Sequence, residues 1–273
     1  MSIKQPTRVI AIASGKGGVG KTMVSANLAS ALASKRRKVL LFDADLGLAN
    51  AQLALGVRVP FNFSHVLNGE KTLKDIIIDV SENLRFVPGG SGIQKLANLD
   101  GVLSAGIVSA FSEITEDIDF FIVDIAAGIS DSVMTFLGAC PERYIVVNND
   151  PSSIADAYGT IKVMIEEYKL ENISIIPNKV TNQDEGETLS RHLNKVTNKF
   201  LGKETKYLHS ISQDEMVERS LKASQPVLSF SPSCRASQDI KALADKVDSL
   251  PALSTTYGGI QFFIERINLQ HSA

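Results

Sequence analysis

The sequence predicts an α/β protein with a mostly parallel central sheet between two layers of helices, a three-layer sandwich. Short apolar runs alternate with helical segments along most of the chain, which is typical of β-α-β units. Several of these runs end directly in Asp, Asn or Gly, and such residues gather at the carboxyl edge of a parallel sheet, where ligands bind. The first run leads into the Gly-rich segment SGKGGVGKT at residues 14–22, and a helical pattern follows it.

The elements can be placed in order from the apolar runs and their periodicity. Runs of strand length occupy residues 9–13, 39–42, 84–87, 120–123, 144–147 and 173–176. Helical patterns occupy residues 21–34, 106–114, 153–168, 185–200, 214–223 and 235–250. We expect residues 1–250 to form one domain, followed by a linker at 251–259 and a separate C-terminal segment at 260–273.

Composition argues against several classes of protein. With 273 residues, 44% of them hydrophobic, and a net charge of −2, the chain is ordinary for a globular protein, and broad electrostatic binding to nucleic acid is not expected. The two cysteines, Cys140 and Cys234, form no C-x-x-C motif, which argues against a paired-cysteine metal or cluster site. No apolar run reaches the roughly 18 residues of a membrane span and no signal peptide precedes the first strand, so we expect a cytoplasmic protein.

The segment at 14–22 satisfies two phosphate-binding motifs at once. Its glycines at positions 15, 17 and 20 fit the G-x-G-x-x-G fingerprint of dinucleotide sites. The same segment, ending in Lys21 and Thr22, fits the G-x4-G-K-[ST] loop of nucleoside triphosphatases. A dinucleotide site also uses an acid about 20 residues farther on, for which Asp43 and Asp45 are candidates.

Three features favour the nucleoside triphosphate. Lys21 and Thr22 directly follow the last glycine, where such a loop places a lysine on the β- and γ-phosphates and a hydroxyl on Mg²⁺. Asp124 ends an apolar strand, as a carboxylate that supports Mg²⁺ does. Gly128 follows four residues later and suits a loop whose backbone N–H meets the γ-phosphate. The cofactors expected are therefore ATP or ADP with Mg²⁺.

The stretch GKGGVGKT at 15–22 resembles the deviant Walker A loop of the MinD/ParA family, which implies a P-loop NTPase fold of the SIMIBI, MinD-like type. From spacing alone, Lys16 could be a solvated surface lysine. In that family the early lysine reaches across a nucleotide-sandwich dimer and contacts the phosphates of the partner subunit. The resemblance thus implies a homodimer that forms with ATP, and hydrolysis that depends on the dimer.

Four other segments are similar to the FlhG (FleN) branch of that family, whose members set flagellar number. Residues 41–50, LFDADLGLAN, resemble its switch I segment. Residues 124–130 (DIAAGIS), 150–158 (DPSSIADAY) and 259–266 (GIQFFIER) agree with the same branch. The resemblance extends from residue 9 to about residue 267.

The resemblance implies roles for individual residues. Lys21 would bind the β- and γ-phosphates, Lys16 would act on the partner subunit's nucleotide, and Asp45 would position the attacking water. By composition alone, Asp43 is an equal candidate for that last role. Mg²⁺ is expected at Thr22, Asp43, Asp45 and Asp124. The nucleotide is expected against Gly15, Lys16, Gly17, Gly18, Val19, Gly20, Lys21, Thr22, Met23, Asn50, Gly128 and Asn178, the last of which would read adenine.

The sequence also departs from the branch at three places. Ile125 stands where the branch has a threonine whose hydroxyl would lie near the metal, so we expect slow or altered hydrolysis. Residues 148–150 (NND) replace a Cys-Asp-Glu-like run. The motif D-Q-A-x-x-L-R, which relatives use to activate the GTPase FlhF, does not occur in this sequence.

The C-terminal segment predicts a short amphipathic helix. The apolar residues Ile260, Phe263, Ile264 and Ile267 recur at i, i+3, i+4 and i+7, which places them on one face of a helix, and Phe262 flanks that face. Pattern alone allows either a last helix packed on the core or a reversible membrane anchor, and the resemblance implies the anchor. The helix is barely two turns long, so one copy should bind membrane weakly, and two copies on a dimer should gain avidity. The membrane residues expected are Ile260, Phe262, Phe263, Ile264 and Ile267.

Together these features predict a slow, dimerisation-dependent ATPase that regulates flagellar number or placement at the inner face of the cell membrane. The partners implied by the resemblance are an FlhF-type GTPase of the signal-recognition-particle class, a FleQ-type transcription activator and flagellar C-ring components. Direct nucleic-acid binding is not expected. The alternatives are a Min-type cell-division or cargo-positioning ATPase, a ParA-like DNA-partition ATPase and a module that binds nucleotide without hydrolysing it.

Overall fold

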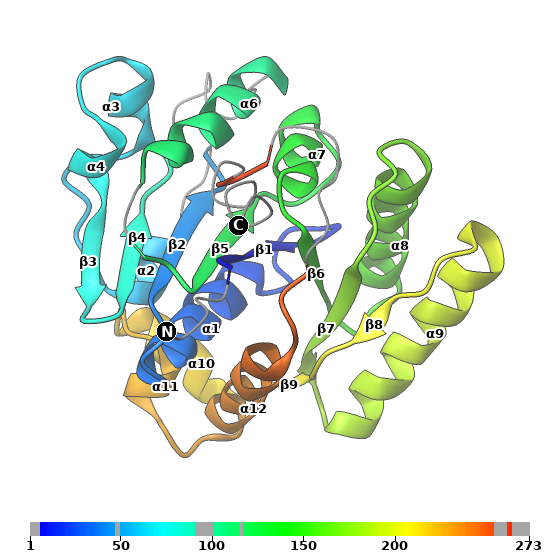
Figure 1. Cartoon of the computed structure of the whole chain (residues 1–273). Helices are drawn as coiled ribbons and strands as arrows, with labels where there is room; N and C mark the ends of the chain where they lie inside the picture. The colour runs from blue at the N-terminus through cyan, green and yellow to red at the C-terminus, as the bar shows by residue number, and fades with distance from the viewer. Residues whose placement is uncertain (1–5, 47–49, 91–100, 115–116, 254–260, 264–273) are drawn as a thin grey trace, which may run out of the picture.

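The computed structural model describes residues 6–46, 50–90, 101–114, 117–253 and 261–263 (Figure 1). A nine-stranded sheet forms its centre, with the strand order β3-β4-β2-β5-β1-β6-β7-β8, and β9 pairs with β7 beside this path. Every described pairing is parallel except that of β3 with β4. The predicted α/β sandwich with a mostly parallel sheet is confirmed. The strands are β1 (Arg8–Ala13), β2 (Val39–Ala44), β3 (Ile78–Ser81), β4 (Leu84–Val87), β5 (Phe120–Ile125), β6 (Glu142–Val147), β7 (Ile173–Val180), β8 (Lys206–Tyr207) and β9 (Ile211–Ser212).

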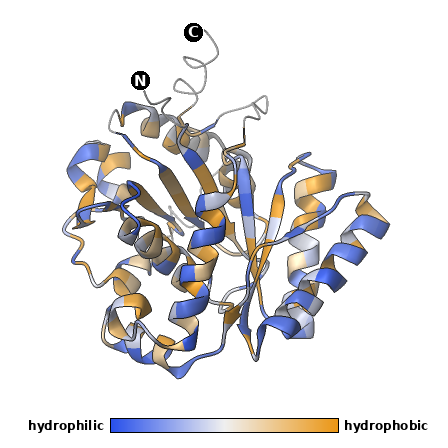
Figure 2. Cartoon of the chain, turned by 60° about the horizontal axis from the view of Figure 1, so that its bottom comes forward, coloured by the Kyte–Doolittle hydropathy of each residue, from blue (hydrophilic) through white to orange (hydrophobic). Residues whose placement is uncertain are grey.

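Helices cover both faces of the sheet. One face carries α1 (Lys21–Ser34), α2 (Ala51–Leu55), α10 (Glu215–Lys222), α11 (Val227–Phe230) and α12 (Arg235–Ser249). The other face carries α3 (Phe63–Leu67), α4 (Leu73–Ile76), α6 (Gly101–Ala110), η1 (Phe111–Glu113), α7 (Asp131–Gly138), α8 (Pro151–Glu166) and α9 (Gln183–Leu201). Figure 2 shows apolar residues concentrated on the central strands and polar residues on the outer sides of the helices.

Alternation along the strands assigns side chains to the two faces. On β5, Phe121, Val123 and Ile125 belong to the core beneath α6–α8, whereas Phe120 and Ile122 belong to the core beneath α1. Both sets are buried because helices cover both sides, so these strands read as continuous apolar runs rather than as alternating ones. The helix α1 is buried almost all round, since α2, α11 and α12 pack on the side that faces away from the sheet.

The helices begin where polar caps predict them to begin. Asp150 Oδ1 accepts hydrogen bonds from the backbone N–H of Ser152 (3.0 Å) and Ser153 (3.1 Å), and Pro151 occupies the first turn of α8. Asn182 caps α9 in the same manner, and that helix ends at Gly202 in the left-handed conformation. These local signals explain why the helices fall close to the expected ranges.

The sequence analysis missed several elements. The strand β3 lies at the edge of the sheet, where its half-buried residues give no continuous apolar run. The helices α2, α3, α4 and α11 are only four or five residues long, too short for a helical period to register. The strands β8 and β9 are two residues each and depend on pairing with β7.

Of the C-terminal segment, the structure describes residues 261–263. They form a turn, with Phe263 at φ +59°, so these three residues do not belong to the amphipathic helix expected from residue 260. The rings of Phe262 and Phe263 are 0% and 2% exposed, and the N–H of Phe262 donates to the carbonyl of Ala139 at 3.3 Å. The other expected membrane residues, Ile260, Ile264 and Ile267, and most of the expected linker lie outside the described residues.

Candidate nucleotide-binding site

The Gly-rich segment connects the carboxyl end of β1 to the first turn of α1. Gly20 immediately precedes the helix with φ +94°, and Gly18 has φ +82°, so both occupy backbone conformations that suit glycine. A Cβ at Gly20 would lie 2.4 Å from Asn178 Nδ2, which itself donates to the carbonyl of Val19 at 2.7 Å. The loop is therefore held in shape from the carboxyl end of β7, two strands away from β1.

Gly15 has a packing role that its motif position does not reveal. A Cβ there would lie 2.3 Å from the backbone carbon and oxygen of Asp156 on α8. The absence of a side chain thus allows the first turns of α8 to approach the loop closely. Gly15 does not line the cavity described below.

Lys21 lies on the first turn of α1 and forms a buried ion pair. Its Nζ is 2.6 Å from Asp124 Oδ1, and both side chains are buried. The hydroxyl of Ser25, one turn farther along α1, donates to the same carboxylate oxygen at 2.9 Å. The other oxygen of Asp124, Oδ2, is buried without a hydrogen-bond partner. The motif lysine and the carboxylate at the end of β5 are therefore in direct contact.

Asp43 lies beside this pair, because its position on β2 is in register with Asp124 on β5. Its Oδ2 accepts from the N–H of Ala51 at 3.0 Å, and its Oδ1 accepts from the N–H of Asp45 at 3.2 Å. Burial, followed by the charge of Asp124, raises the pKa of Asp43 to about 7. Two buried carboxylates and an unpartnered oxygen form a donor set that suits a hard divalent cation such as Mg²⁺.

The expected metal ligands are not all gathered at one point. Among the described residues, no group of three or more His, Cys, Asp or Glu side chains could hold a metal ion. Asp45 is half-buried and lines the cavity, whereas Asp43 and Asp124 lie behind Lys21 and do not line it. A metal ion here would therefore take further ligands from the Thr22 hydroxyl, water and the nucleotide.

A cavity of about 790 Å³ opens beside the loop, at the carboxyl edge of the sheet. This volume falls in the usual range of small-molecule sites. Of the expected nucleotide and metal residues, Gly17, Gly18, Val19, Gly20, Lys21, Thr22, Met23, Asp45, Asn50 and Asn178 line it. Sequence reasoning missed the opposite wall, which consists of Lys179, Ser212, Gln213, Asp214, Glu215, Val217, Glu218 and Leu221.

Asn178 closes the cavity between these two walls. It is 1% exposed. Its amide nitrogen donates a hydrogen bond to the carbonyl of Val19, while its Oδ1 is buried without a hydrogen-bond partner. Beside it, Lys179 Nζ donates to the carbonyl of Gly18 at 3.0 Å. An unused acceptor oxygen at the wall of a cavity can receive a hydrogen bond from the amino group of a ligand.

Lys16 points away from the cavity and contacts the first turn of α8. Its Nζ donates to the hydroxyl of Ser152 and lies 3.6 Å from Asp150 Oδ1. The lysine and aspartate side chains are 39% and 46% exposed, so this contact lies at the surface. Hydrogen bonding from Ser152, together with Lys16, holds the pKa of Asp150 below its ordinary value. The two lysines of the loop thus have separate partners within one chain.

Two further expected residues lie beside the site. Gly128 has φ +104° and its N–H donates to the carbonyl of Ser14 at 3.1 Å, but it does not line the cavity.

The expectation that residue 125 faces the metal is wrong. Asp124 points to the α1 face of β5, so the next side chain, Ile125, points to the opposite face and is 0% exposed in the core.

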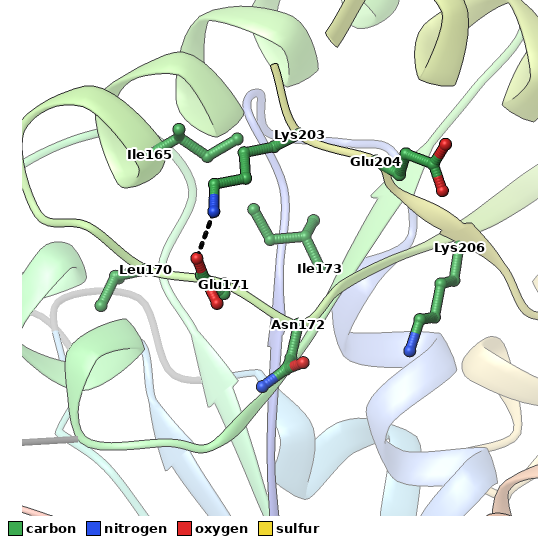
Figure 3. A pocket seen from close by; sticks show the side chains of 8 residues that line it. All are labelled: Ile165, Leu170, Glu171, Asn172, Ile173, Lys203, Glu204 and Lys206. Carbon is green, nitrogen blue, oxygen red and sulfur yellow. Dashed lines mark hydrogen bonds and ion pairs between the residues drawn. The ribbon is translucent and has the colours of Figure 1, made fainter. Parts of the chain in front are cut away.

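A second, smaller hollow of about 180 Å³ lies at the opposite edge of the sheet (Figure 3). It is lined at the beginning of β7 and β8, and Lys203 is already paired with Glu171 there. Ligands of parallel α/β sheets bind at the carboxyl ends of the strands, so this hollow is the weaker candidate.

Comparison with known proteins agrees with this geometry. The family described as the CobQ/CobB/MinD/ParA nucleotide binding domain matches residues 10–227. The protein called "Antiactivator FleN" from Pseudomonas aeruginosa is 40% identical over 273 residues, covering 100% of this chain and 97% of that protein. The chain is a MinD/ParA-type ATPase of the FlhG (FleN) branch. The resemblance described for its loop and switch segments is therefore confirmed at the level of the family.

Two other relatives support the same assignment. The "Flagellum site-determining protein YlxH" of Helicobacter pylori is 34% identical over 280 residues, covering 98% of this chain and 95% of that protein. The septum site-determining protein MinD from Pyrococcus horikoshii, solved as a complex with Mg-ADP, superposes with a TM-score of 0.75 at 28% identity. That match covers 89% of this chain and 97% of that chain. In the part of the FleN-like chain that the structure describes, no helix is long and apolar enough to span a membrane.

Proposed function

We propose that this protein is an ATP-dependent dimerising switch that hydrolyses ATP slowly and regulates flagellar number or placement. The observation that carries the proposal is the buried contact of Lys21 with Asp124 at the end of the Gly-rich loop, beside a cavity of about 790 Å³. The full-length similarity to FleN and YlxH supports the flagellar role.

The residues of the site have distinct tasks in this proposal. The backbone N–H groups of residues 17–20 hold the phosphates at the beginning of α1. Lys21 leaves Asp124 and binds the β- and γ-phosphates, which accept its charge in place of the carboxylate. Mg²⁺, when bound with the nucleotide, neutralises phosphate charge. Thr22 and Asp124 would hold the ion, and Asp45 at the cavity wall would orient the attacking water.

Lys16 takes its partner from the second subunit. In the single chain it is held by Ser152 and Asp150 at the surface, and exposed ion pairs of this kind contribute little to stability because water screens them. Exchange of that contact for a phosphate of the partner subunit therefore costs little. Dimerisation then depends on bound ATP. The loop carries two lysines because Lys21 binds the nucleotide of its own subunit and Lys16 binds that of the partner subunit.

The buried phenyl rings of the C-terminal segment suit a docked state of the membrane anchor. Full burial of two phenylalanine side chains contributes about 3–6 kcal/mol, and this has to be offset when the segment leaves the core. Insertion of the same rings into lipid returns a similar amount, so a single copy gains little. Two copies on an ATP dimer bind the membrane by avidity, which places the dimer rather than the monomer at the membrane.

The test is light scattering of wild type and of Lys16→Ala, each with ADP and with ATP plus Mg²⁺. We expect ATP to double the mass of wild type, whereas Lys16→Ala stays monomeric with nucleotide bound. Lys162→Ala is the matched control, because Lys162 is also a half-exposed lysine with a carboxylate partner, Glu166 at 3.8 Å. A dimer of Lys16→Ala as stable as that of wild type would remove the dimer switch from the proposal.

The partners separate this proposal from its alternatives. The FlhG branch implies an FlhF-type GTPase, a FleQ-type activator and C-ring components, whereas a Min-type protein would position cell-division proteins or cargo with the same chemistry. A DNA-partition ATPase would retain nonspecific DNA when ATP is bound and would not bind lipid. Flotation with anionic vesicles and a DNA retention assay, both with ATP and with ADP, distinguish these classes. Lipid binding that does not depend on nucleotide would contradict the docked state.

A further inference from the structure

The two ends of the cavity differ in chemistry. Lys21 and Thr22 define the phosphate end, so a nucleoside triphosphate placed there directs its base toward the wall formed by residues 212–215, 217, 218 and 221. That wall offers the apolar side chains of Val217 and Leu221, and Asn178 offers a buried acceptor oxygen without a partner. A flat heterocycle with an amino group fits these surroundings. We call residues 212–215 the base wall.

The base wall is anchored from outside the cavity. The Oδ2 atom of Asp239, on α12, accepts a hydrogen bond from the N–H of Ser212 at 2.8 Å. Its Oδ1 accepts from Gln183 Nε2 at 2.9 Å, and the same Gln183 nitrogen donates to the carbonyl of Ser210 at 3.1 Å. Burial acts to raise the pKa of Asp239, but His209 and the N–H of Ser212 outweigh it and hold the pKa below its ordinary value. The anchor is therefore a carboxylate.

A second contact fixes the other end of the base wall to the same helix. Asp214 Oδ2 accepts from the N–H of Ala236, in the first turn of α12, at 3.2 Å. Its Oδ1 accepts from the N–H of Met216 at 2.9 Å and so begins α10. Ala236 and Asp239 are three residues apart and share one face of α12. Ser212 and Asp214 of the base wall are thus both hydrogen-bonded to the same helix, α12.

That helix is in turn packed against the helix that begins at the phosphate loop. Ile240, Leu243 and Ala244 of α12 are fully buried in the core that contains α1. The separation between the phosphate end and the base wall is therefore set by the close packing of α12 on α1, together with the pairing of β9 with β7, in which Ser212 lies opposite Val180. Asp239 connects α12 to Ser212 through its hydrogen bond, although its own side chain does not line the cavity.

We propose that Asp239 is a positioning residue that sets the base wall, and that it gives this site its preference for an adenine nucleotide. The inference rests on the proposed nucleotide-binding function. Without the carboxylate, the buried N–H of Ser212 loses this acceptor. The base wall then keeps only the contact of Asp214 with α12 and the pairing of β9 with β7, so it is held less firmly relative to Asn178. The base then loses its fit while the phosphate end, held by α1, keeps its own.

The test compares binding of ATP, GTP and inorganic tripolyphosphate, each with Mg²⁺, by isothermal titration calorimetry. For Asp239→Ala we expect roughly a tenfold loss of affinity for ATP and a fall in the ATP-to-GTP ratio, with affinity for tripolyphosphate unchanged within about twofold. Asp239→Asn retains one acceptor oxygen for Ser212 and should stay within about threefold of wild type for ATP. Asp245→Ala is the matched control, because Asp245 lies on the same helix and pairs with Lys35, at the end of α1 away from the cavity.

The possible outcomes distinguish a failure of the positioning role of Asp239 from a failure of the proposed nucleotide-binding function. Equal losses for ATP and tripolyphosphate in Asp239→Ala, or an unchanged ATP-to-GTP ratio, would overturn the positioning role and leave the nucleotide site intact. A wild type that binds all three probes without preferring ATP would overturn it as well. A wild type that binds none of the three would overturn the proposed function itself. Circular dichroism of each variant confirms that it is folded. If Asp239→Ala does not fold, a roughly tenfold loss of ATP affinity in Asp239→Asn, which keeps an acceptor oxygen, would overturn the positioning role.

Discussion

Replacement of Phe262 by alanine tests whether the C-terminal segment is a real part of the core. The ring is 0% exposed and lies 4.9 Å from Phe121, 5.3 Å from Phe111 and 6.5 Å from Phe136, measured between ring centroids. A buried Phe→Ala change costs about 3–5 kcal/mol if it leaves a cavity. If the segment detaches instead, the loss is limited to the free energy of docking two rings, about 3–6 kcal/mol. The two routes therefore predict overlapping losses of stability.

The measurement is urea unfolding of the nucleotide-free protein, with the free energy of unfolding taken from the midpoint and slope. Phe200→Ala is the matched control, because Phe200 is 62% exposed on α9 and its removal should change stability by no more than about 0.5 kcal/mol. A lower slope in Phe262→Ala would indicate that the segment is already detached in the folded variant. The packing argument fails if Phe262→Ala and Phe200→Ala are equally stable.

Three other substitutions test the site. Gly20→Ala adds a Cβ 2.4 Å from Asn178 Nδ2 at a φ of +94°, so we expect a loss of about 1–2 kcal/mol from the backbone alone and weaker ATP binding, measured by urea unfolding and calorimetry. Ile125→Thr places a hydroxyl in the apolar core, so it should lower stability by about 1–3 kcal/mol without raising the ATPase rate; a faster enzyme would contradict the observed face of residue 125. Lys21→Ala leaves Asp124 buried without its cation and should lower the stability of the nucleotide-free protein by about 3–5 kcal/mol; a loss within 1 kcal/mol would show that the pair is not formed in solution.

Much of the fold was predictable because its signals are local. The six expected strands occur, and most differ from their predicted bounds by one or two residues at either end. Parallel strands buried on both faces give continuous apolar runs, and capping residues such as Asp150 and Asn182 mark helix starts in the sequence itself. The short helices and β3 were missed because a period needs length to show, and because an edge strand is only half-buried.

The residues of the phosphate end were predictable for a related reason. Lys21 and Thr22 are consecutive in one motif, and Asp124 ends an apolar strand, so spacing alone predicts their chemistry. Their geometry was not predictable. The direct contact of Lys21 with Asp124 and the side-by-side carboxylates of Asp43 and Asp124 follow from strand order, which sets β5 between β1 and β2. Strand order is a result of long-range packing and leaves no local pattern.

By itself, then, the sequence determined the fold class, the phosphate loop and the family, because each depends on consecutive residues or on a short repeat of apolar residues. Only the tertiary structure decided which face Ile125 takes, why Gly15 must lack a side chain, and that Phe262 fills the core. It also brought the carboxylate of Asp239, more than 200 residues after the loop in the chain, into a hydrogen bond with Ser212 at the opposite wall of the cavity. These features depend on contacts between segments far apart in sequence, and such contacts exist only once the helices have packed on the sheet.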